Sequence, residues 1–102
     1  MADAALGLNS VGSQQLTVST SAVSLTMPTS TRPKHATISI GSNPVRYLAT
    51  GTAPTSTTGT PLVAGAYLNC MDPNIDYFGF LKTVQFIRSG GADATLDIEY
   101  FS

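Results

Sequence analysis

The feature that most constrains the fold is the alternation of apolar and polar residues near the end of the sequence. Residues 82–88 alternate around Phe86, and residues 94–101 place Ala94, Leu96, Ile98 and Tyr100 on one side and Thr95, Asp97 and Glu99 on the other. Successive side chains of a strand point to opposite faces of a sheet, so this spacing predicts two strands that each bury one face. The Gly90-Gly91 pair between them predicts a turn, and we expect a closing β-hairpin with Phe86, Leu96 and Ile98 in the core.

The same alternation recurs along most of the chain. Strands are expected at residues 14–20, 22–27, 35–40, 45–49, 61–63 and 66–70, with 35–40 and 45–49 paired as a hairpin around the Gly41-Ser42-Asn43-Pro44 turn. The apolar residues stand at even positions up to Val18 and at odd positions from Val23, which predicts a bulge or short turn at residues 19–21. No segment shows helical spacing. About eight short strands predict an all-β fold, an antiparallel β-sandwich, with a jelly roll as the more specific form.

The length of the chain, 102 residues, has room for one domain, which we assign to residues 14–102. Residues 1–13 are small, weakly polar and aperiodic, and they predict an extended N-terminal arm. Leu6, Leu8 and Val11 give this arm apolar side chains that a neighbouring chain would bury. A frayed terminus is the alternative.

Charged residues are scarce in this sequence. They make up 11% of the chain, against about 25% in an ordinary soluble domain, and Ser and Thr supply about a quarter of the residues. A surface of hydroxyls, Ala and Gly is easier to desolvate than one of Lys and Glu, so the composition favours burial against partner subunits. A secreted or repeat-like β domain with a Thr-rich surface is the alternative. The net charge is −1 and the basic residues are scattered, so nucleic-acid binding is not expected.

The single cysteine and the N-terminus bear on where such a protein works. Cys70 has no partner for an intrachain disulfide, and we expect it to pack as a small hydrophobic residue, as in a protein made in a reducing cytoplasm. The first residues lack the positive start and apolar run of a signal peptide. No segment approaches the length of a membrane span, and membrane insertion is not expected.

One loop carries the beginning of a calcium-binding pattern. Asp72-Pro73-Asn74-Ile75-Asp76 matches the first three ligand positions of a calcium loop. The position that requires glycine is Tyr77, and the position that requires a bidentate Glu is Thr83. An Asx turn between strands accounts for the same residues, and we assign no metal site.

Other residues that could take part in catalysis or ligand binding are isolated from the partners that such sites need. His35 begins a strand with no nucleophile motif near it, and we expect it to be exposed or at an interface. Asp97 and Glu99 lie on the outward face of one strand and are expected to be solvated. Gly90-Gly91 lacks the Lys and helix of a phosphate loop. Aromatic residues able to stack on sugars are Tyr47, Tyr67, Tyr77 and Phe78, most of them expected to pack in the core. We predict no catalytic, cofactor-binding or metal-binding residues and no enzymatic activity.

The order of strand and turn residues resembles a family of small all-β virion proteins of tailed bacteriophages. The resemblance rests on Ala36-Thr37-Ile38-Ser39-Ile40, Pro44-Val45-Arg46-Tyr47, the turn residues Gly51, Thr52, Pro54 and Thr55, then Gly59, Leu62, Val63 and Gly65, and finally Phe86-Ile87-Arg88, Gly90-Gly91 and Asp93-Ala94-Thr95-Leu96. It covers residues 35–101, about two-thirds of the chain. Thr50 departs from the pattern, since an acidic residue often stands there in the family. These proteins resemble head decoration, or cement, proteins.

The resemblance implies a structural virion protein. It would bind the major capsid protein on the outer surface of the assembled head, after synthesis in the host cytoplasm, and would stabilise the shell. We expect a homo-oligomer, most simply a trimer, because the domain is small and carries little charge. A tail, neck or fibre component is the second expectation. A carbohydrate-binding module is a more distant one, because the chain has no Trp. A small hydrolase has the least support.

Overall fold

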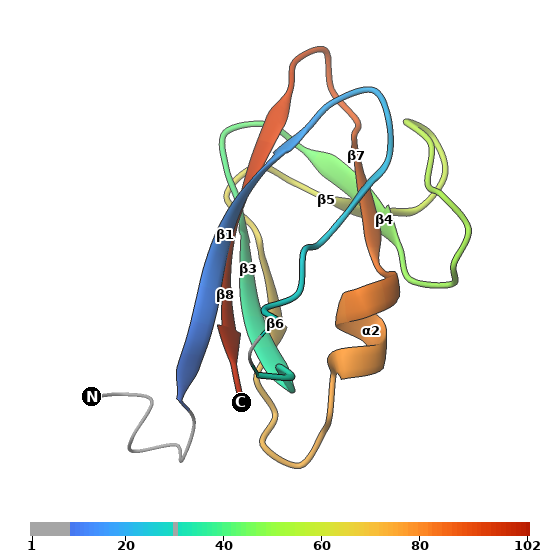
Figure 1. Ribbon diagram of the computed structural model, residues 1–102. Helices are drawn as coiled ribbons and strands as arrows, with labels where there is room; N and C mark the ends of the chain where they lie inside the picture. The colour runs from blue at the N-terminus through green and yellow to red at the C-terminus, as the bar shows by residue number, and fades with distance from the viewer. Residues whose placement is uncertain (1–8, 30) are drawn as a thin grey trace.

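The computed structural model describes residues 9–29 and 31–102, which form two four-stranded antiparallel sheets packed face to face (Figure 1). The first sheet has the order β1 (Ser10–Val18), β8 (Ala94–Phe101), β3 (His35–Ile40), β6 (Tyr67–Cys70). The second sheet has the order β2 (Val23–Ser24), β7 (Gln85–Arg88), β4 (Val45–Leu48), β5 (Thr60–Leu62). A short helix, α2 (Phe78–Thr83), precedes β7. The all-β sandwich expected from the alternation is confirmed.

The strand order is that of a jelly roll. Strands β1, β2, β3 and β4 pair antiparallel with β8, β7, β6 and β5 respectively. The first half of the chain therefore runs beside the second half in reverse, as in one long hairpin folded over itself into two sheets. The pairs β3–β8 and β4–β7 complete the sheets. The more specific of the two fold expectations is thus the one found.

Both hairpins expected from the sequence are wrong, because each joins strands of different sheets. Strands β3 and β7 lead to β4 and β8 across the sandwich. The two connections lie at the same end: Gly41 N–H donates to the Thr95 carbonyl (2.8 Å), and Ser89 N–H donates to the Pro44 carbonyl (3.2 Å). A turn rich in Gly, Asn and Pro reverses the chain whether the next strand joins the same sheet or the facing one. Among the strands described, only β4 and β5 are consecutive and paired.

The change of parity between Val18 and Val23 has the same origin. Strand β1 belongs to the first sheet and β2 to the second, so the inward direction reverses when the chain crosses between them. The chain crosses between the sheets at residues 19–22 with a bend at residues 20–21, which fits the expected short turn and not the alternative of a bulge within one sheet. Arg88 N–H donates to the Ser19 carbonyl there (3.1 Å). The strand expected at residues 22–27 is shorter in the structure and spans only Val23–Ser24.

The chain joins the sheet earlier than the expected start of the domain at residue 14. Residues 10–13 belong to β1 and pair with the end of β8. Asn9 and Ser102 exchange backbone hydrogen bonds of 3.4 and 3.0 Å, and Val11 packs against the core. The expectation of an extended arm is therefore corrected for residues 9–13. Residues 1–8 of the predicted arm lie outside the described residues.

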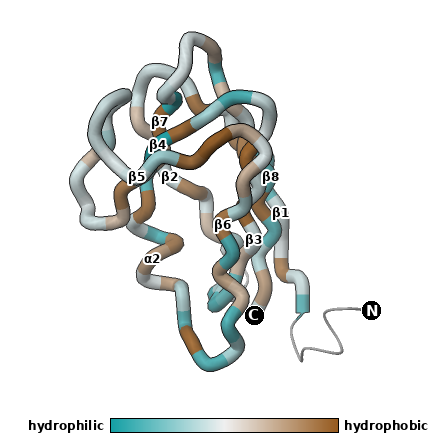
Figure 2. Tube along the Cα trace, turned by 180° about the vertical axis from the view of Figure 1, so that it is seen from behind, coloured by the Kyte–Doolittle hydropathy of each residue, from teal (hydrophilic) through white to brown (hydrophobic). Residues whose placement is uncertain are grey.

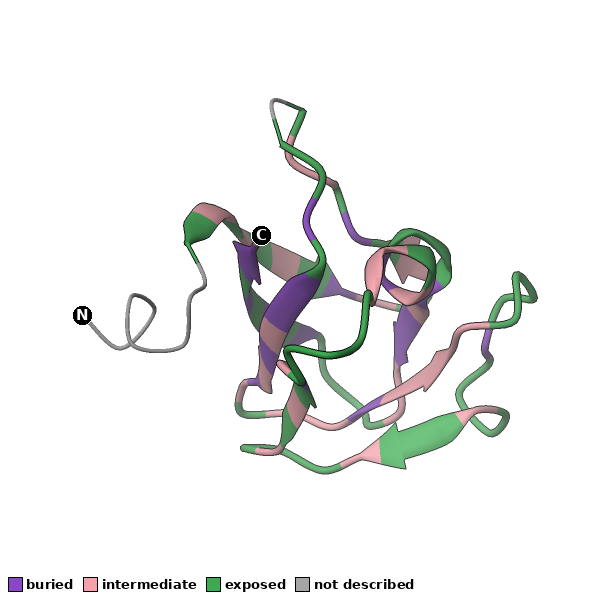
Figure 3. Cartoon of the chain, turned by 90° about the horizontal axis from the view of Figure 1, so that it is seen from below, coloured by how far each residue is buried: buried purple, intermediate pink, exposed green. Residues whose placement is uncertain are grey.

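The core lies between the two sheets (Figure 3). Phe86, Leu96 and Ile98 are buried as expected, with 0, 0 and 2% of their surface exposed. The other large, fully buried side chains in the described part of the chain are Val18, Pro33, Ile38, Val45, Leu81, Val84 and Tyr100.

Helix α2 was not expected from the sequence. It places Leu81 in the core, and Thr83 Oγ1 bonds to the Gly79 carbonyl one turn earlier (2.7 Å). Six residues form less than two turns, which is too short for a periodic signal. No helix in the described part of the chain is long and apolar enough to cross a membrane.

Candidate functional site

The Asp72–Asp76 segment is built as a connection between β6 and α2. Asp72 Oδ1 accepts the Asn74 N–H (3.0 Å), and Ile75 N–H donates to the Asp72 carbonyl (3.1 Å). This is the Asx turn expected as the alternative to a calcium loop. Among the described residues, no three or more His, Cys, Asp or Glu side chains gather in a way that could hold a metal ion.

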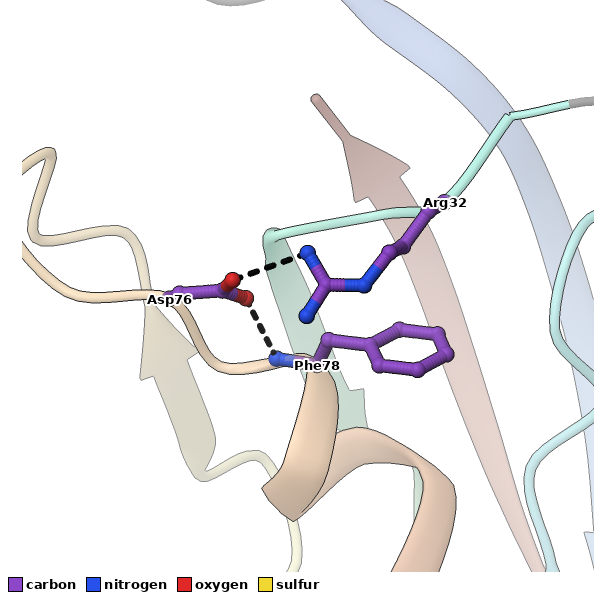
Figure 4. Close-up of polar contacts among 3 residues, drawn as sticks. All are labelled: Arg32, Asp76 and Phe78. Carbon is purple, nitrogen blue, oxygen red and sulfur yellow. Dashed lines mark hydrogen bonds and ion pairs between the residues drawn. The ribbon is translucent and has the colours of Figure 1, made fainter.

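The carboxylate of Asp76 is engaged on both oxygens (Figure 4). Oδ1 accepts the Phe78 N–H (3.0 Å) and Oδ2 accepts Arg32 Nη1 (2.8 Å). The Phe78 N–H, and then Arg32, hold the pKa of Asp76 below its usual value. The guanidinium of Arg32 lies over the Phe78 ring, with Cζ 4.3 Å from the centroid. This cluster fastens the loop that enters β3 to the start of α2.

His35 is buried, which corrects the expectation of an exposed or interfacial residue. Only 4% of its surface is exposed. Its Nε2 lies 2.9 Å from the Asp72 carbonyl oxygen, and the Tyr77 ring packs against it edge-on, 5.8 Å between centroids. Nδ1 is buried without a hydrogen-bond partner in the described structure. The histidine connects β3 to the 72–77 segment and has no nucleophile or carboxylate as a hydrogen-bond partner there.

The outer surface of the first sheet carries the two carboxylates of β8. Asp97 and Glu99 are exposed, as expected from their parity. Gln15 Nε2 donates to Asp97 Oδ1 (3.1 Å), and Ser10 Oγ donates to Glu99 Oε2 (2.9 Å). An open hollow of about 590 Å³ lies over this surface. We call it the polar face and define it by Ser13, Gln15, Thr37, Ser39, Tyr67, Asn69, Asp97 and Glu99.

The four aromatic candidates have different surroundings. Tyr47 packs on Phe80 and Phe86 at 6.3 and 6.0 Å between centroids. Tyr77 packs on His35, and Phe78 lies beneath Arg32. Tyr67 alone of the four stands free, with 73% of its surface exposed, on the polar face.

The long loop between β4 and β5 folds back onto the second sheet. Arg46 donates from Nε to the Ser56 carbonyl (3.1 Å) and from Nη1 to the Gly59 carbonyl (2.9 Å). Gly59 has a positive φ of 126°, and a Cβ there would lie 2.9 Å from the Tyr47 carbonyl oxygen. A second open hollow, of about 710 Å³, lies between this loop, the 20–22 crossing and β7.

Two smaller expectations concern Cys70 and the Gly90-Gly91 turn. Cys70 is buried at 4% exposure, and burial raises the pKa of its thiol to about 11, so it packs as the expected small hydrophobic residue. Gly90-Gly91 lies in the connection from β7 to β8, beside the Arg88–Asp93 ion pair (2.7 Å).

No family model matches the chain, and comparison with curated proteins and with solved structures finds no significant match. The phage-protein family expected from the strand and turn residues therefore stays a prediction.

Proposed function

We propose that this chain is a structural protein of a tailed-bacteriophage virion, a decoration protein that binds the outer surface of the assembled head and stabilises it. The observation that carries the proposal is the complete jelly-roll strand order. Viral capsid domains are among the proteins that use this architecture. Lectins and cupins use it too, so the fold needs support from the chemistry of the surface.

The surface chemistry supports a role in assembly. Only 11% of the residues are charged, and four of them neutralise each other in the Arg32–Asp76 and Arg88–Asp93 pairs. Much of the chain between the strands is neither strongly hydrophilic nor strongly hydrophobic (Figure 2). Such a surface loses little hydration energy when another protein covers it.

The partners in this proposal are the major capsid protein and further copies of the same chain, most simply in a trimer at a symmetry axis of the shell. Many weak contacts repeated by symmetry give high avidity without one strong site. Residues 2–8 are proposed to contact a neighbouring chain, and a further strand would add beside an edge strand. The edges are β1 and β6 in the first sheet and β2 and β5 in the second. Pro61 in β5 donates no backbone hydrogen bond and β2 has only two residues, so β1 and β6 are the more suitable edges.

A tail, neck or fibre component of the virion is the alternative, because the same sandwich and the same low charge suit it equally. The location of the protein on the particle distinguishes the two.

The test is co-sedimentation of the purified protein with empty capsids and with free capsid subunits. We expect saturable binding to the assembled lattice and none to the free subunit. A ligand that binds only one state at a hundredfold excess over its Kd stabilises that state by about 2.7 kcal/mol per site. Stripped heads should therefore lose heat resistance and regain it on re-addition. Equal stability of stripped and decorated heads, or a location on tails only, would refute the decoration role.

A further inference from the structure

We infer that the polar face of the first sheet is a binding site for a neutral glycan. The inference does not depend on the proposed virion role. It rests on how the sheet register places polar side chains, on one exposed aromatic ring and on the sign of the charges.

The register aligns the side chains of the polar face in two parallel rows. One row crosses the sheet as Gln15, Asp97, Ser39, Tyr67, and the next as Ser13, Glu99, Thr37, Asn69. Neighbouring strands are about 4.8 Å apart, so each row presents hydroxyl, amide and carboxylate groups at short, regular intervals. A sugar chain lying along a row would meet both donors and acceptors within hydrogen-bonding reach.

Tyr67 provides the apolar part of the site. Its side chain ends the first row and is 73% exposed, while every other member of the two rows is polar. A tyrosine ring offers a flat apolar surface that packs against the C–H groups of a sugar, and its hydroxyl stays available for hydrogen bonding.

The charges on the polar face select among possible ligands. Asp97 and Glu99 are its ionisable acids, and no Lys or Arg stands in either row. Phosphate, sulfate and nucleic-acid ligands are repelled by this arrangement, because they need cations to neutralise them. Carboxylates accept hydrogen bonds from neutral hydroxyl groups, and each already accepts one from the protein, from Gln15 and from Ser10.

The arrangement favours binding over hydrolysis. Asp97 and Glu99 project from the same face of one strand, so both would contact a sugar chain from the same side. Glycoside cleavage requires two carboxyl groups that flank the bond. The hollow is open and shallow, which suits the side of a polysaccharide chain more than its end.

The test is an NMR titration of the ¹⁵N-labelled protein with cellohexaose, maltohexaose and mannohexaose, with a heparin hexasaccharide as the anionic counterpart. We expect at least one neutral hexasaccharide to shift the amides of β1, β8, β3 and β6 saturably, and heparin to leave them unchanged. Tyr67→Ala should weaken binding about tenfold, the loss of one aromatic contact. Val63→Ala is the matched control, because Val63 is 70% exposed but lies outside the rows.

Three outcomes would overturn the inference: no response to any neutral hexasaccharide, equal binding by Tyr67→Ala and the wild type, or binding of heparin at the same residues. Sedimentation of the wild type and both variants can give a fourth such outcome. If the wild type is an oligomer that binds no sugar, and Tyr67→Ala dissociates it, the polar face is a contact between copies of the chain. Capsid co-sedimentation of Tyr67→Ala separates this inference from the proposed virion role, since the variant should still bind heads if the two surfaces differ.

Discussion

The hydroxyl of Tyr100 donates a 3.1 Å hydrogen bond to Oε1 of Gln14, and the same oxygen accepts the backbone N–H of Thr26 at 3.0 Å. One amide oxygen of β1 thus joins β8 to the segment that follows β2. Tyr100 is 1% exposed, so this bond satisfies a hydroxyl that is otherwise buried in the core.

Tyr100→Phe should lower the free energy of unfolding by about 0.5–1.5 kcal/mol, because it removes one hydrogen bond and leaves Gln14 bonded to Thr26. Burial raises the pKa of Tyr100 from 10.0 to about 12. The folded state therefore favours the neutral phenol, and this contribution is complete below pH 10 and is lost as the pH rises toward 12. Urea unfolding measured from neutral to alkaline pH checks both effects. A variant that shows the same alkaline loss as the wild type would contradict the assignment.

Leu96→Ala should lower the free energy of unfolding by about 2–4 kcal/mol, because it leaves a cavity at a fully buried position in a central strand. Glu99→Gln, on the outer face of the same strand, should change the free energy of unfolding by no more than about 0.5 kcal/mol. Chemical denaturation of the two variants compares the inner and outer faces of β8 directly. A loss below about 0.5 kcal/mol for Leu96→Ala would contradict the core placement.

Cys70 should react slowly with a thiol reagent such as DTNB at pH 8, because it is buried and its thiol pKa is raised to about 11. The reaction should become fast in denaturant, and Cys70→Ala should abolish it. The folded state favours the neutral thiol, so its contribution to stability is complete below pH 9 and declines as the pH rises toward 11. Reaction at the same rate in native and unfolded protein would show that the thiol is accessible.

The acid side of the stability curve should depend on Asp76. Its pKa lies below the usual 3.8 in the folded state, so its contribution is present above that value and is lost as the pH falls through the folded pKa. Asp76→Asn keeps an acceptor for Phe78 N–H but removes the charge next to Arg32. The difference in unfolding free energy between wild type and variant should narrow below pH 3.8. If the difference in unfolding free energy stays constant to the lowest pH measured, the charge of the Asp76 carboxylate does not contribute to stability.

Arg46→Ala should release the loop between β4 and β5, because it removes both hydrogen bonds that hold the Ser56 and Gly59 carbonyls. Amide hydrogen exchange at Thr55 and Thr58, whose backbones bond to each other, should accelerate. Arg32→Ala is the matched control, since it removes an arginine anchored elsewhere. Unchanged exchange in Arg46→Ala would mean that the loop holds itself in place.

The strand positions were predictable because alternation is a local property of the sequence. The run from His35 to Ile40 was expected at the bounds that the structure gives it. The pairing of strands was not predictable from the turns, because a turn such as residues 41–44 does not specify which sheet receives the next strand. The change of parity between Val18 and Val23 was the one local sign of a crossing, and it also fits a bulge.

The candidate site was predictable to a similar extent. Parity alone placed Asp97 and Glu99 outward. Tyr67 appeared among four aromatic candidates, but its exposure depends on the position of β6 at the edge of the first sheet. The burial of His35 depends on the 72–77 segment, which packs against it from a distant part of the sequence. Neither the exposure of Tyr67 nor the burial of His35 leaves a pattern in the neighbouring sequence.

The place of β8 between β1 and β3 has a consequence for synthesis. The first sheet cannot be completed until β8, one of its two inner strands, exists, and β8 is the last of the described elements to be translated. On the ribosome, β1 and β3 emerge long before the strand that joins them, so their apolar faces stay uncovered and prone to aggregate during that interval. The scarcity of long apolar runs before residue 77, and the many Ser and Thr residues there, would keep such a nascent chain soluble.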